Sequence, residues 1–479
     1  MRRGPGPLGS LAILLLLAGC GSAPEVRPPV LDVDVPEAWT AVSPGETAAE
    51  SGEGGGSWWH LFGDVKLNDL VAEALERNFD LEGAAARIDA AAAQARIAGS
   101  HLPPDLAASL TAARRKQRFV GLPIPGDDVL TSTSNSFGAS LDVTWEIDLW
   151  GRIRSGRSAA LADVEAARAD LEGARLSLAA QTAKTWFAAA EASQQVRLAE
   201  ETVESYGRSA EEVRERYVRG VLSSLDLRLA LSNLASAEAL LEAREQQLDE
   251  SVRQLEILLG RYPGRGIAPA VELPGVPDPP PPGLPSDLVF RRPDLASAER
   301  RLASADARLA QARAGLYPRL SLTGGAGTAS DELRDLLDRN GSVWNIVGNL
   351  LQPLFQGGRL RAGVDLAEAS TRQAAAAYGG ALLNAFAEVE ATLAAEGHLA
   401  RREDRLAEAA GQAAAAEELA GEQYRLGLVD QVTLLEAQRR NLTARSEYIS
   451  ARRARLDARV NLHLALGGGF VFGEEDGAS

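Results

Sequence analysis

Residues Glu215–Leu227 read ERYVRGVLSSLDL, and residues Glu422–Leu434 read EQYRLGLVDQVTL. A tyrosine, a glycine and a leucine recur between the two stretches at one constant spacing, without a gap. A spacing of this length is far above the 20–50-residue period of a solenoid. It predicts one large helix–strand–helix unit that occurs twice in the chain. The matched pairs are Tyr217 and Tyr424, Gly220 and Gly427, and Leu227 and Leu434.

The doubling extends outward from these stretches. Residues 77–104 match residues 291–318, and Leu149–Ile153 (LWGRI) falls on Gln356–Leu360 (QGGRL). The chain therefore divides into a first structural repeat and a second structural repeat, with a proline-rich linker between them and a flexible tail after them. The predicted bounds are 58–273 and 287–468 for the repeats, 274–286 for the linker and 469–479 for the tail.

Each repeat contains two predicted strands. Residues 137–149 alternate between apolar and polar side chains, the period of a strand with one apolar face. The run is long for a globular protein and suits a strand of a membrane barrel. We predict strands at about 105–119 and 136–150 in the first repeat. The weaker alternation in the second repeat predicts strands at about 319–329 and 343–355.

A very long helix follows each pair of strands. The stretches 158–217 and 362–424 contain no proline, and 60 helical residues span about 90 Å. A return helix with leucine or isoleucine at every seventh position follows each one, which indicates coiled-coil-like packing. The tips of the two predicted hairpins lie at about 217–226 and 424–433.

The N-terminal residues predict export and lipid attachment. Residues 1–19 combine a basic start with a short apolar core, as in a secretory signal peptide. Cys20 is the only cysteine and follows Leu17-Ala18-Gly19, so we expect it to carry covalent lipid, palmitate included. The alternative is a plain cleaved signal with an incidental cysteine. Residues 20–57 are then a lipid-anchored tether.

The composition argues against several functions. The formal net charge of −16 disfavours nucleic acid as a partner. The four histidines lack the spacing of metal ligands, and the lysine-containing phosphate loop of an ATPase is absent. We therefore expect no enzyme, no metal and no cofactor apart from the lipid on Cys20.

The strands and helices together predict an α+β membrane protein that needs several chains. Four strands cannot close a membrane barrel, and an open sheet edge is not tolerated in lipid. Two chains would supply eight strands and three chains would supply twelve, and both numbers suit a barrel. The strand pattern alone leaves this choice open.

Several motifs occur in a set order along the chain from Trp58 to Gly469. They are Trp58–Asp64, Leu284–Leu288, Arg291–Asp294, Tyr317–Leu322, Pro353–Phe355 with Gly357–Leu360, and Ala465–Gly469. Together they resemble the TolC-like outer-membrane factors, specifically the lipoprotein (NodT-type) branch of RND efflux systems. The resemblance implies a homotrimer with a 12-stranded β-barrel continuous with a 12-helix periplasmic α-barrel, in the outer membrane of a Gram-negative bacterium.

The resemblance also implies a function and its residues. The trimer would passively export small molecules that an inner-membrane RND pump passes on with a periplasmic adaptor (membrane fusion protein). Hairpin tips would dock the adaptor through Gly220, Leu222, Ser223, Gly427 and Val429. A periplasmic gate would involve Asp226, Tyr424, Asp430, Thr433 and Glu436.

The second tip departs from the family pattern. Thr433 and Glu436 stand where two ring aspartates are expected, and Val429 replaces a basic partner. Two other functions remain open at this point. One is a related duct for type I protein secretion. The other is a periplasmic coiled-coil scaffold lipoprotein, which would have no use for the alternating strand.

Overall fold

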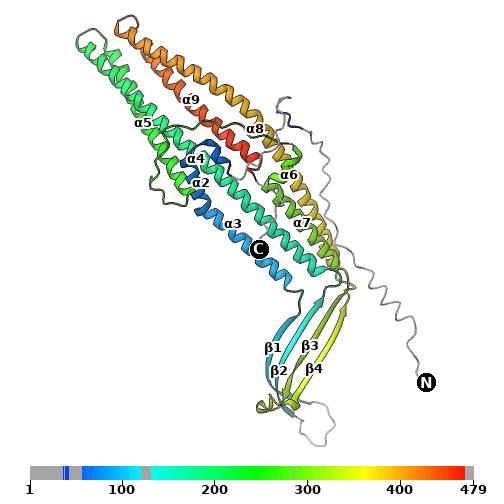
Figure 1. Ribbon diagram of the computed structural model, residues 1–479. Coiled ribbons are helices and arrows are strands. Elements are labelled where there is room, and N and C mark those ends of the chain that lie inside the picture. The colour runs from blue at the N-terminus through cyan, green and yellow to red at the C-terminus, as the bar shows by residue number, and fades with distance from the viewer. Residues whose placement is uncertain (1–35, 37, 42–56, 120–130, 284, 470–479) are drawn as a thin grey trace, which may run out of the picture.

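The computed structural model describes residues 36, 38–41, 57–119, 131–283 and 285–469. The molecule is elongated, with a sheet at one end and two long helical hairpins at the other (Figure 1). Its helices are η1 (Trp58–Phe62), α2 (Val65–Arg77), α3 (Phe79–Gly99), α4 (Arg152–Val218), α5 (Ser224–Leu258), η2 (Pro285–Asp287), α6 (Leu288–Arg291), α7 (Pro293–Ala314), η3 (Leu333–Asp335), η4 (Arg339–Gly341), α8 (Arg359–Arg425) and α9 (Gln431–Ala465), and its strands are β1 (Asp105–Arg118), β2 (Thr131–Ile147), β3 (Arg319–Ser330) and β4 (Ser342–Leu351).

The four strands form one antiparallel sheet in the order β1-β2-β3-β4. Each strand pairs with its neighbour in sequence, so β2 and β3 join the two halves of the chain across the middle of the sheet. β1 and β4 are the outer strands, and within the described residues neither has a second neighbour. The sheet therefore has two open edges.

Two predicted strands have different ends in the structure. The strand predicted at 136–150 is β2, which begins at Thr131 because its first residues pair with the far end of β1. β2 ends at Ile147, since the next residue caps the following helix. The strand predicted at 343–355 is β4, which ends at Leu351, two residues before Pro353, a residue without a backbone N–H for a ladder.

The two hairpins have matching dimensions. α4 and α8 each contain 67 residues, and α5 and α9 each contain 35. A 67-residue helix is about 100 Å long. Both long helices begin earlier than predicted, directly after Gly151 and Gly358, whose φ values of 76° and 82° let the chain turn from the sheet into the helix. α4 packs against α5 and α9, and α9 packs against α8.

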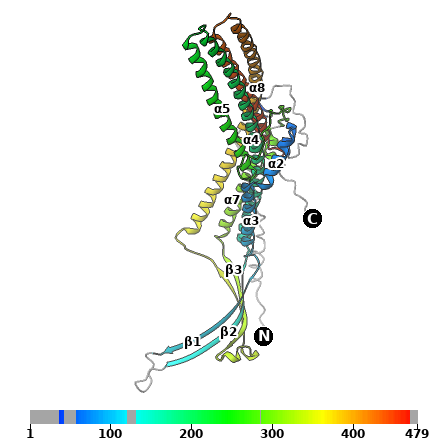
Figure 2. The same ribbon diagram turned by 90° about the vertical axis from the view of Figure 1, so that its left-hand side faces the viewer.

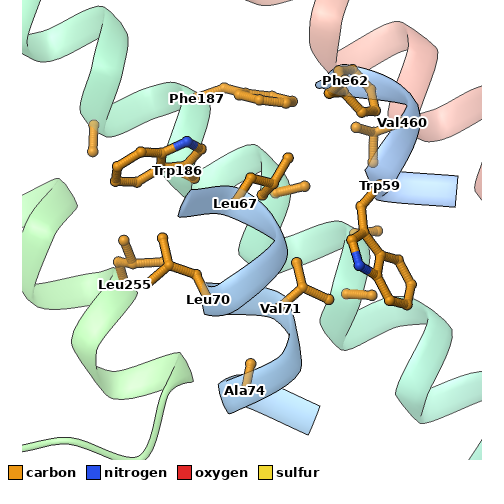
Figure 3. Close-up of a cluster of buried hydrophobic side chains, with 14 of the residues drawn as sticks. Trp59, Phe62, Leu67, Leu70, Val71, Ala74, Trp186, Phe187, Leu255 and Val460 are labelled. Carbon is orange, nitrogen blue, oxygen red and sulfur yellow. The ribbon is translucent and has the colours of Figure 1, made fainter. Parts of the chain in front are cut away.

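The main apolar core lies around α2, midway along the molecule (Figure 1), and Figure 3 shows it in close-up. Helix α2 inserts Leu67, Leu70 and Val71 between α4, α5 and α9, and all three are at most 1% exposed. On α4, Trp186 and Phe187 close this core. Asp64 holds α2 in place, because its carboxylate caps the helix and accepts a hydrogen bond from the Trp186 indole at 2.7 Å.

A second apolar cluster holds part of the N-terminal tether. Trp39 is buried against α6, α7, α8 and α9, and its indole donates a hydrogen bond to the Gly283 carbonyl at 3.0 Å. The backbone N–H groups of Thr40 and Ala41 donate to the Glu390 carboxylate at 2.8 and 2.9 Å. The described piece of the tether is thus fastened to α8 and to the proline-rich linker.

Candidate functional site

The first hairpin tip turns at a glycine in the left-handed conformation. Gly220 has a φ of 79°, and its N–H donates to the Tyr217 carbonyl at 2.8 Å. The next N–H, that of Val221, donates to the Arg216 carbonyl at 2.9 Å. This pair of bonds is a Schellman motif, which satisfies the last carbonyls of α4. Gly220 is therefore needed for the turn itself.

The second tip repeats the same turn. Gly427 has a φ of 73° and donates to the Tyr424 carbonyl, and Leu428 donates to the Gln423 carbonyl at 2.8 Å. The two tips lie next to each other at the end of the molecule far from the sheet (Figures 1 and 2). The side-chain amide of Gln431 donates to the Asp226 carbonyl at 3.2 Å and ties one tip to the other.

Three of the predicted gate residues, Asp226, Asp430 and Thr433, form local hydrogen bonds in helix caps. Ser223 caps α5, and its hydroxyl and backbone N–H both donate to Asp226, at 2.8 and 2.9 Å. At the second tip Asp430 caps α9 and accepts bonds from the Thr433 N–H and hydroxyl, at 2.9 and 2.7 Å. These bonds to Thr433 lower the pKa of the Asp430 carboxyl. Each tip thus contains one acid and one hydroxyl in a cap.

The other two predicted gate residues differ in environment. Glu436 is paired with Arg440 and Arg439, each at 2.8 Å, and these two guanidinium groups lower the pKa of its carboxyl. Tyr424 is 3% exposed, and the Arg216 guanidinium from the first hairpin lies 4.8 Å from its ring centre. Burial raises the pKa of the Tyr424 hydroxyl. Tyr424 and Arg216 therefore form a cation–π contact between the hairpins.

Two predicted adaptor contacts point inward. Leu222 packs against buried residues between α4 and α5, and Val429 packs in the cluster of Tyr424. Both are only partly exposed. The apolar side chains that do project at the tips are 59–78% exposed. They are Val218, Val221, Leu225, Leu426, Leu428 and Val432.

Between the apolar core and the tips, the two hairpins meet along α4 and α9 through polar side chains. The Gln438 amide donates to the Ser205 hydroxyl at 3.0 Å and to the Ser209 hydroxyl at 3.2 Å. Nearer the middle of the molecule, Ser450 donates to Glu191 at 2.6 Å. We call this set of α4–α9 contacts the polar seam. It contrasts with the apolar packing of α4 against α5 near the first tip.

The sheet has one apolar face and one polar face. On β2 the odd-numbered residues 137–147 are apolar, and their even-numbered neighbours are glycine or polar. Asp142 lies on the polar face and accepts hydrogen bonds from Ser140 at 2.8 Å and from Ser109 at 3.1 Å. Gly325 lies beside it, where an added Cβ would come within 2.8 Å of the Asp142 carboxylate. Such a sheet can separate lipid from a water-filled interior.

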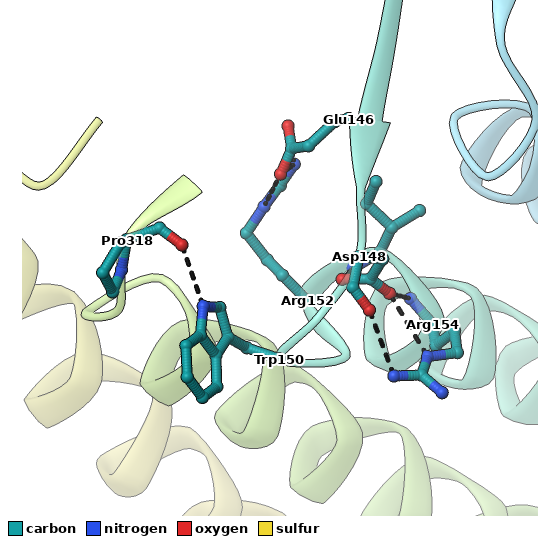
Figure 4. Close-up of polar contacts among 7 residues, drawn as sticks. Glu146, Asp148, Trp150, Arg152, Arg154 and Pro318 are labelled. Atoms are coloured by element: carbon teal, nitrogen blue, oxygen red, sulfur yellow. Dashed lines mark hydrogen bonds and ion pairs between the residues drawn. The ribbon is translucent and has the colours of Figure 1, made fainter. Parts of the chain in front are cut away.

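Polar contacts fix the connection between the sheet and α4 (Figure 4). Asp148 accepts the Ile153 N–H at 3.1 Å and the Arg154 N–H at 2.9 Å, which satisfies the first turn of the helix. Arg152 reaches back to Glu146 at 2.9 Å. Trp150 donates its indole N–H to the Pro318 carbonyl at 2.8 Å, so it links the two halves of the chain.

The described residues contain no group of three or more potential metal ligands. His463 is the one histidine among them that is buried, and it stacks on Trp58 with ring centres 5.3 Å apart. Burial lowers the pKa of His463 to about 4. In the part of the chain that the structure covers, no helix is both long and apolar enough to span a bilayer. Cys20 lies outside the described residues.

Comparison with known proteins identifies the family. The family model described as outer membrane efflux protein matches residues 70–261 and 284–468. The chain is 33% identical to the outer membrane protein OprJ of Pseudomonas aeruginosa over 480 residues, which cover 98% of this chain and 97% of OprJ. It is 32% identical to the pyoverdine export outer membrane protein OpmQ of Pseudomonas putida, over 97% of this chain and 98% of OpmQ.

A solved structure agrees with this assignment. The Campylobacter jejuni CmeC outer membrane channel matches with a TM-score of 0.86 and 27% identity, over 95% of this chain and 96% of CmeC. The chain therefore belongs to the outer membrane efflux protein family, which confirms the resemblance to outer-membrane factors and places the protein in the outer membrane.

Proposed function

We propose that three copies of this chain close into a 12-stranded barrel and a 12-helix tube that together form the exit duct of a tripartite efflux system. The observation that carries this proposal is the four-stranded sheet with an apolar face and two open edges, β1 and β4. Such edges are excluded from lipid unless another chain pairs with them. Joining β4 of one copy to β1 of the next closes the ring.

Aromatic side chains support a membrane position for the sheet. Trp150 stacks on Tyr317 with ring centres 4.9 Å apart, at the end of the sheet that continues into the helices. Phe355 lies close to the same end in sequence and is 89% exposed. Aromatic rings gather at the two interfaces of outer-membrane barrels. This belt would mark the periplasmic interface.

The helical hairpins are then the periplasmic tube. At about 100 Å they are far longer than the roughly 30 Å hydrocarbon core is thick. The tips would meet a periplasmic adaptor through Gly220, Ser223 and Gly427 and through the exposed apolar residues beside them. An inner-membrane RND pump would supply small molecules, and the duct would pass them without chemistry.

The tip contacts give the closed state a physical basis. The Tyr424–Arg216 contact and the Gln431 bond hold the two hairpins of one chain together. Asp226, Asp430, Thr433 and Glu436 place acids and a hydroxyl at the same end. Three copies around an axis would form rings of carboxylates that attract cations. Separation along the polar seam would open the tube.

Conductance of the purified protein in planar bilayers tests the duct directly. We expect long-lived unitary conductance steps from protein that elutes at three times the mass of the chain. Protein that elutes as a monomer and leaves the bilayer silent would contradict the proposal. Lipid on Cys20 is a separate part of it, and intact mass spectrometry should show an acylated Cys20 as the first residue of the mature chain.

A further inference from the structure

The first two strands extend beyond the rest of the sheet. Pairing between β1 and β2 continues to Arg118 opposite Thr131, whereas pairing between β2 and β3 ends at Phe137 opposite Ser330. Residues 113–118 and 131–136 therefore form a two-stranded extension at the end of the sheet far from the helices. Figure 2 shows β1 and β2 curving away to one side of the turn that joins β3 and β4.

The extension is strongly basic in a chain with a net charge of −16. Four of the six residues that β1 contributes are arginine or lysine, and the paired residues of β2 are threonine, serine or asparagine. No acid occurs in the described residues of the extension, and none of its basic side chains forms an ion pair there. The basic residues are Arg114, Arg115, Lys116 and Arg118.

Three of the four basic residues share the apolar face of the sheet. Alternate residues of a strand point to the same side. Arg114, Lys116 and Arg118 continue the row formed by Leu106, Ala108, Leu110 and Ala112. Arg115 belongs to the opposite row, which contains Ser109 of the polar face. The three residues therefore project toward whatever surrounds the barrel, and Arg115 projects toward its interior.

The three basic residues lie at the height of the outer headgroup layer along the proposed barrel. The apolar row of β2 runs from Ile147 to Phe137, ten steps of about 3.4 Å. At the usual strand tilt this spans about 25 Å, the height of the apolar band of outer-membrane barrels. Arg114 is paired with Asn135, the next residue of that row after Phe137. The basic row thus begins where the apolar band ends.

We propose that Arg114, Lys116 and Arg118 bind the phosphate groups of the outer-leaflet lipid, a phosphorylated glycolipid. This inference rests on the proposed barrel. Arginine and lysine are the usual partners of phosphate, and here they lie on the lipid side of the barrel, at headgroup height.

A neighbouring copy is a weaker occupant of the basic row, because three of the four acids in the β3–β4 turn already have partners. Arg334 pairs with Glu332 and Asp335, at 2.6 and 3.7 Å. Asp338 accepts a backbone N–H from Asn340 at 3.1 Å.

Adjacent arginines on opposite faces provide a matched pair of variants for the test. The probe is lipid A with both phosphates, titrated into the purified full-length channel and followed by native mass spectrometry. We expect Arg114→Gln to weaken binding about fivefold and the triple Arg114→Gln/Lys116→Gln/Arg118→Gln variant by roughly 100-fold. Arg115→Gln should change the affinity less than about twofold. Lipid A without phosphates should bind as weakly as the triple variant, and millimolar inorganic phosphate should leave bound lipid A in place.

Equal effects of Arg114→Gln and Arg115→Gln would overturn the inference, as would equal binding of lipid A with and without phosphates. A triple variant that dissociates into single chains would also overturn it and would assign the basic row to contacts between copies. Conductance separates this inference from the proposed function. A triple variant that conducts normally and binds lipid A like the natural chain refutes the lipid site alone.

Discussion

The acid and the hydroxyl of the helix caps exchange places between the two hairpin tips. In the first tip the hydroxyl of Ser223 stands at the cap and Asp226 lies three residues later. In the second tip Asp430 stands at the cap and Thr433 lies three residues later. The threonine at the position where an aspartate was expected is therefore compensated locally. Each tip therefore has one carboxylate in the cap at the start of its return helix.

Variants of Asp226 and Ser223 distinguish a role of Asp226 in the gate from its role in the helix cap. Removal of either partner should destabilise the start of α5 by about 1 kcal/mol, because both variants break the cap. Only Asp226→Ala also removes the carboxylate, so we expect it to raise the conductance of the isolated channel, with Ser223→Ala close to the natural chain. Single-channel recording in planar bilayers measures both. Equal conductance increases in the two variants would reduce the role of Asp226 to capping.

His463 should make the stability of the channel depend on pH. Its pKa is about 4 in the folded chain and ordinarily near 6.5, so between these values the unfolded chain binds a proton that the folded chain does not. Stability should therefore fall as the pH drops from 6.5 to 4, by up to roughly 3 kcal/mol. In thermal melts, His463→Gln should flatten this dependence. The same change at exposed His60 is the control, and a natural-chain slope retained in His463→Gln would refute the assignment.

Sequence reasoning located the elements better than their ends. The alternation of residues 137–149 marked the apolar face of β2, but the serine- and threonine-rich start of that strand has no such pattern, and only pairing with β1 extends it to Thr131. Asp148 was expected to continue the strand, yet its carboxylate serves the first turn of α4. At the tips, Leu222 and Val429 are predicted adaptor contacts. Both also pack beside buried residues between helices, which the sequence does not show.

The packing of α2 between α4, α5 and α9 stabilises the middle of the molecule. Leu67→Ala should lower the stability by about 2–5 kcal/mol, because Leu67 of α2 is completely buried in the core between α4, α5 and α9 and its loss leaves a cavity. Leu61→Ala is the matched control, since Leu61 is 58% exposed and should cost under about 1 kcal/mol. Denaturant melts of both variants test this. Equal midpoints would show that α2 contributes little to the core.

The polar seam explains how one hairpin can move as a unit against the other. Inside the first hairpin, α4 and α5 pack near the tip through apolar side chains such as Val213 and Ala230. Between the hairpins, α4 and α9 meet through groups such as Gln438 with Ser205 and Ser209. Water can replace these hydrogen bonds at small net cost, whereas it cannot replace apolar packing. Movement of one hairpin against the other is therefore easier than separation of α4 from α5.

For the whole molecule, the open edges of the sheet are the strongest constraint. A four-stranded sheet with an apolar face is incomplete as a single chain in lipid. In the described residues the four hairpin helices lie in the order α5-α4-α9-α8, so α5 and α8 are the outer helices of the hairpins. The barrel and the tube therefore both require a ring of several copies of the chain. The strand count alone allowed two or three copies, and the number three came from family resemblance.

Negative-stain electron microscopy of the detergent-purified mature protein tests this claim most directly. We expect particles with three-fold symmetry, a central lumen and a stalk about 100 Å long, which is the length of a 67-residue helix. Single chains, particles of another symmetry or solid rods without a lumen would contradict the account.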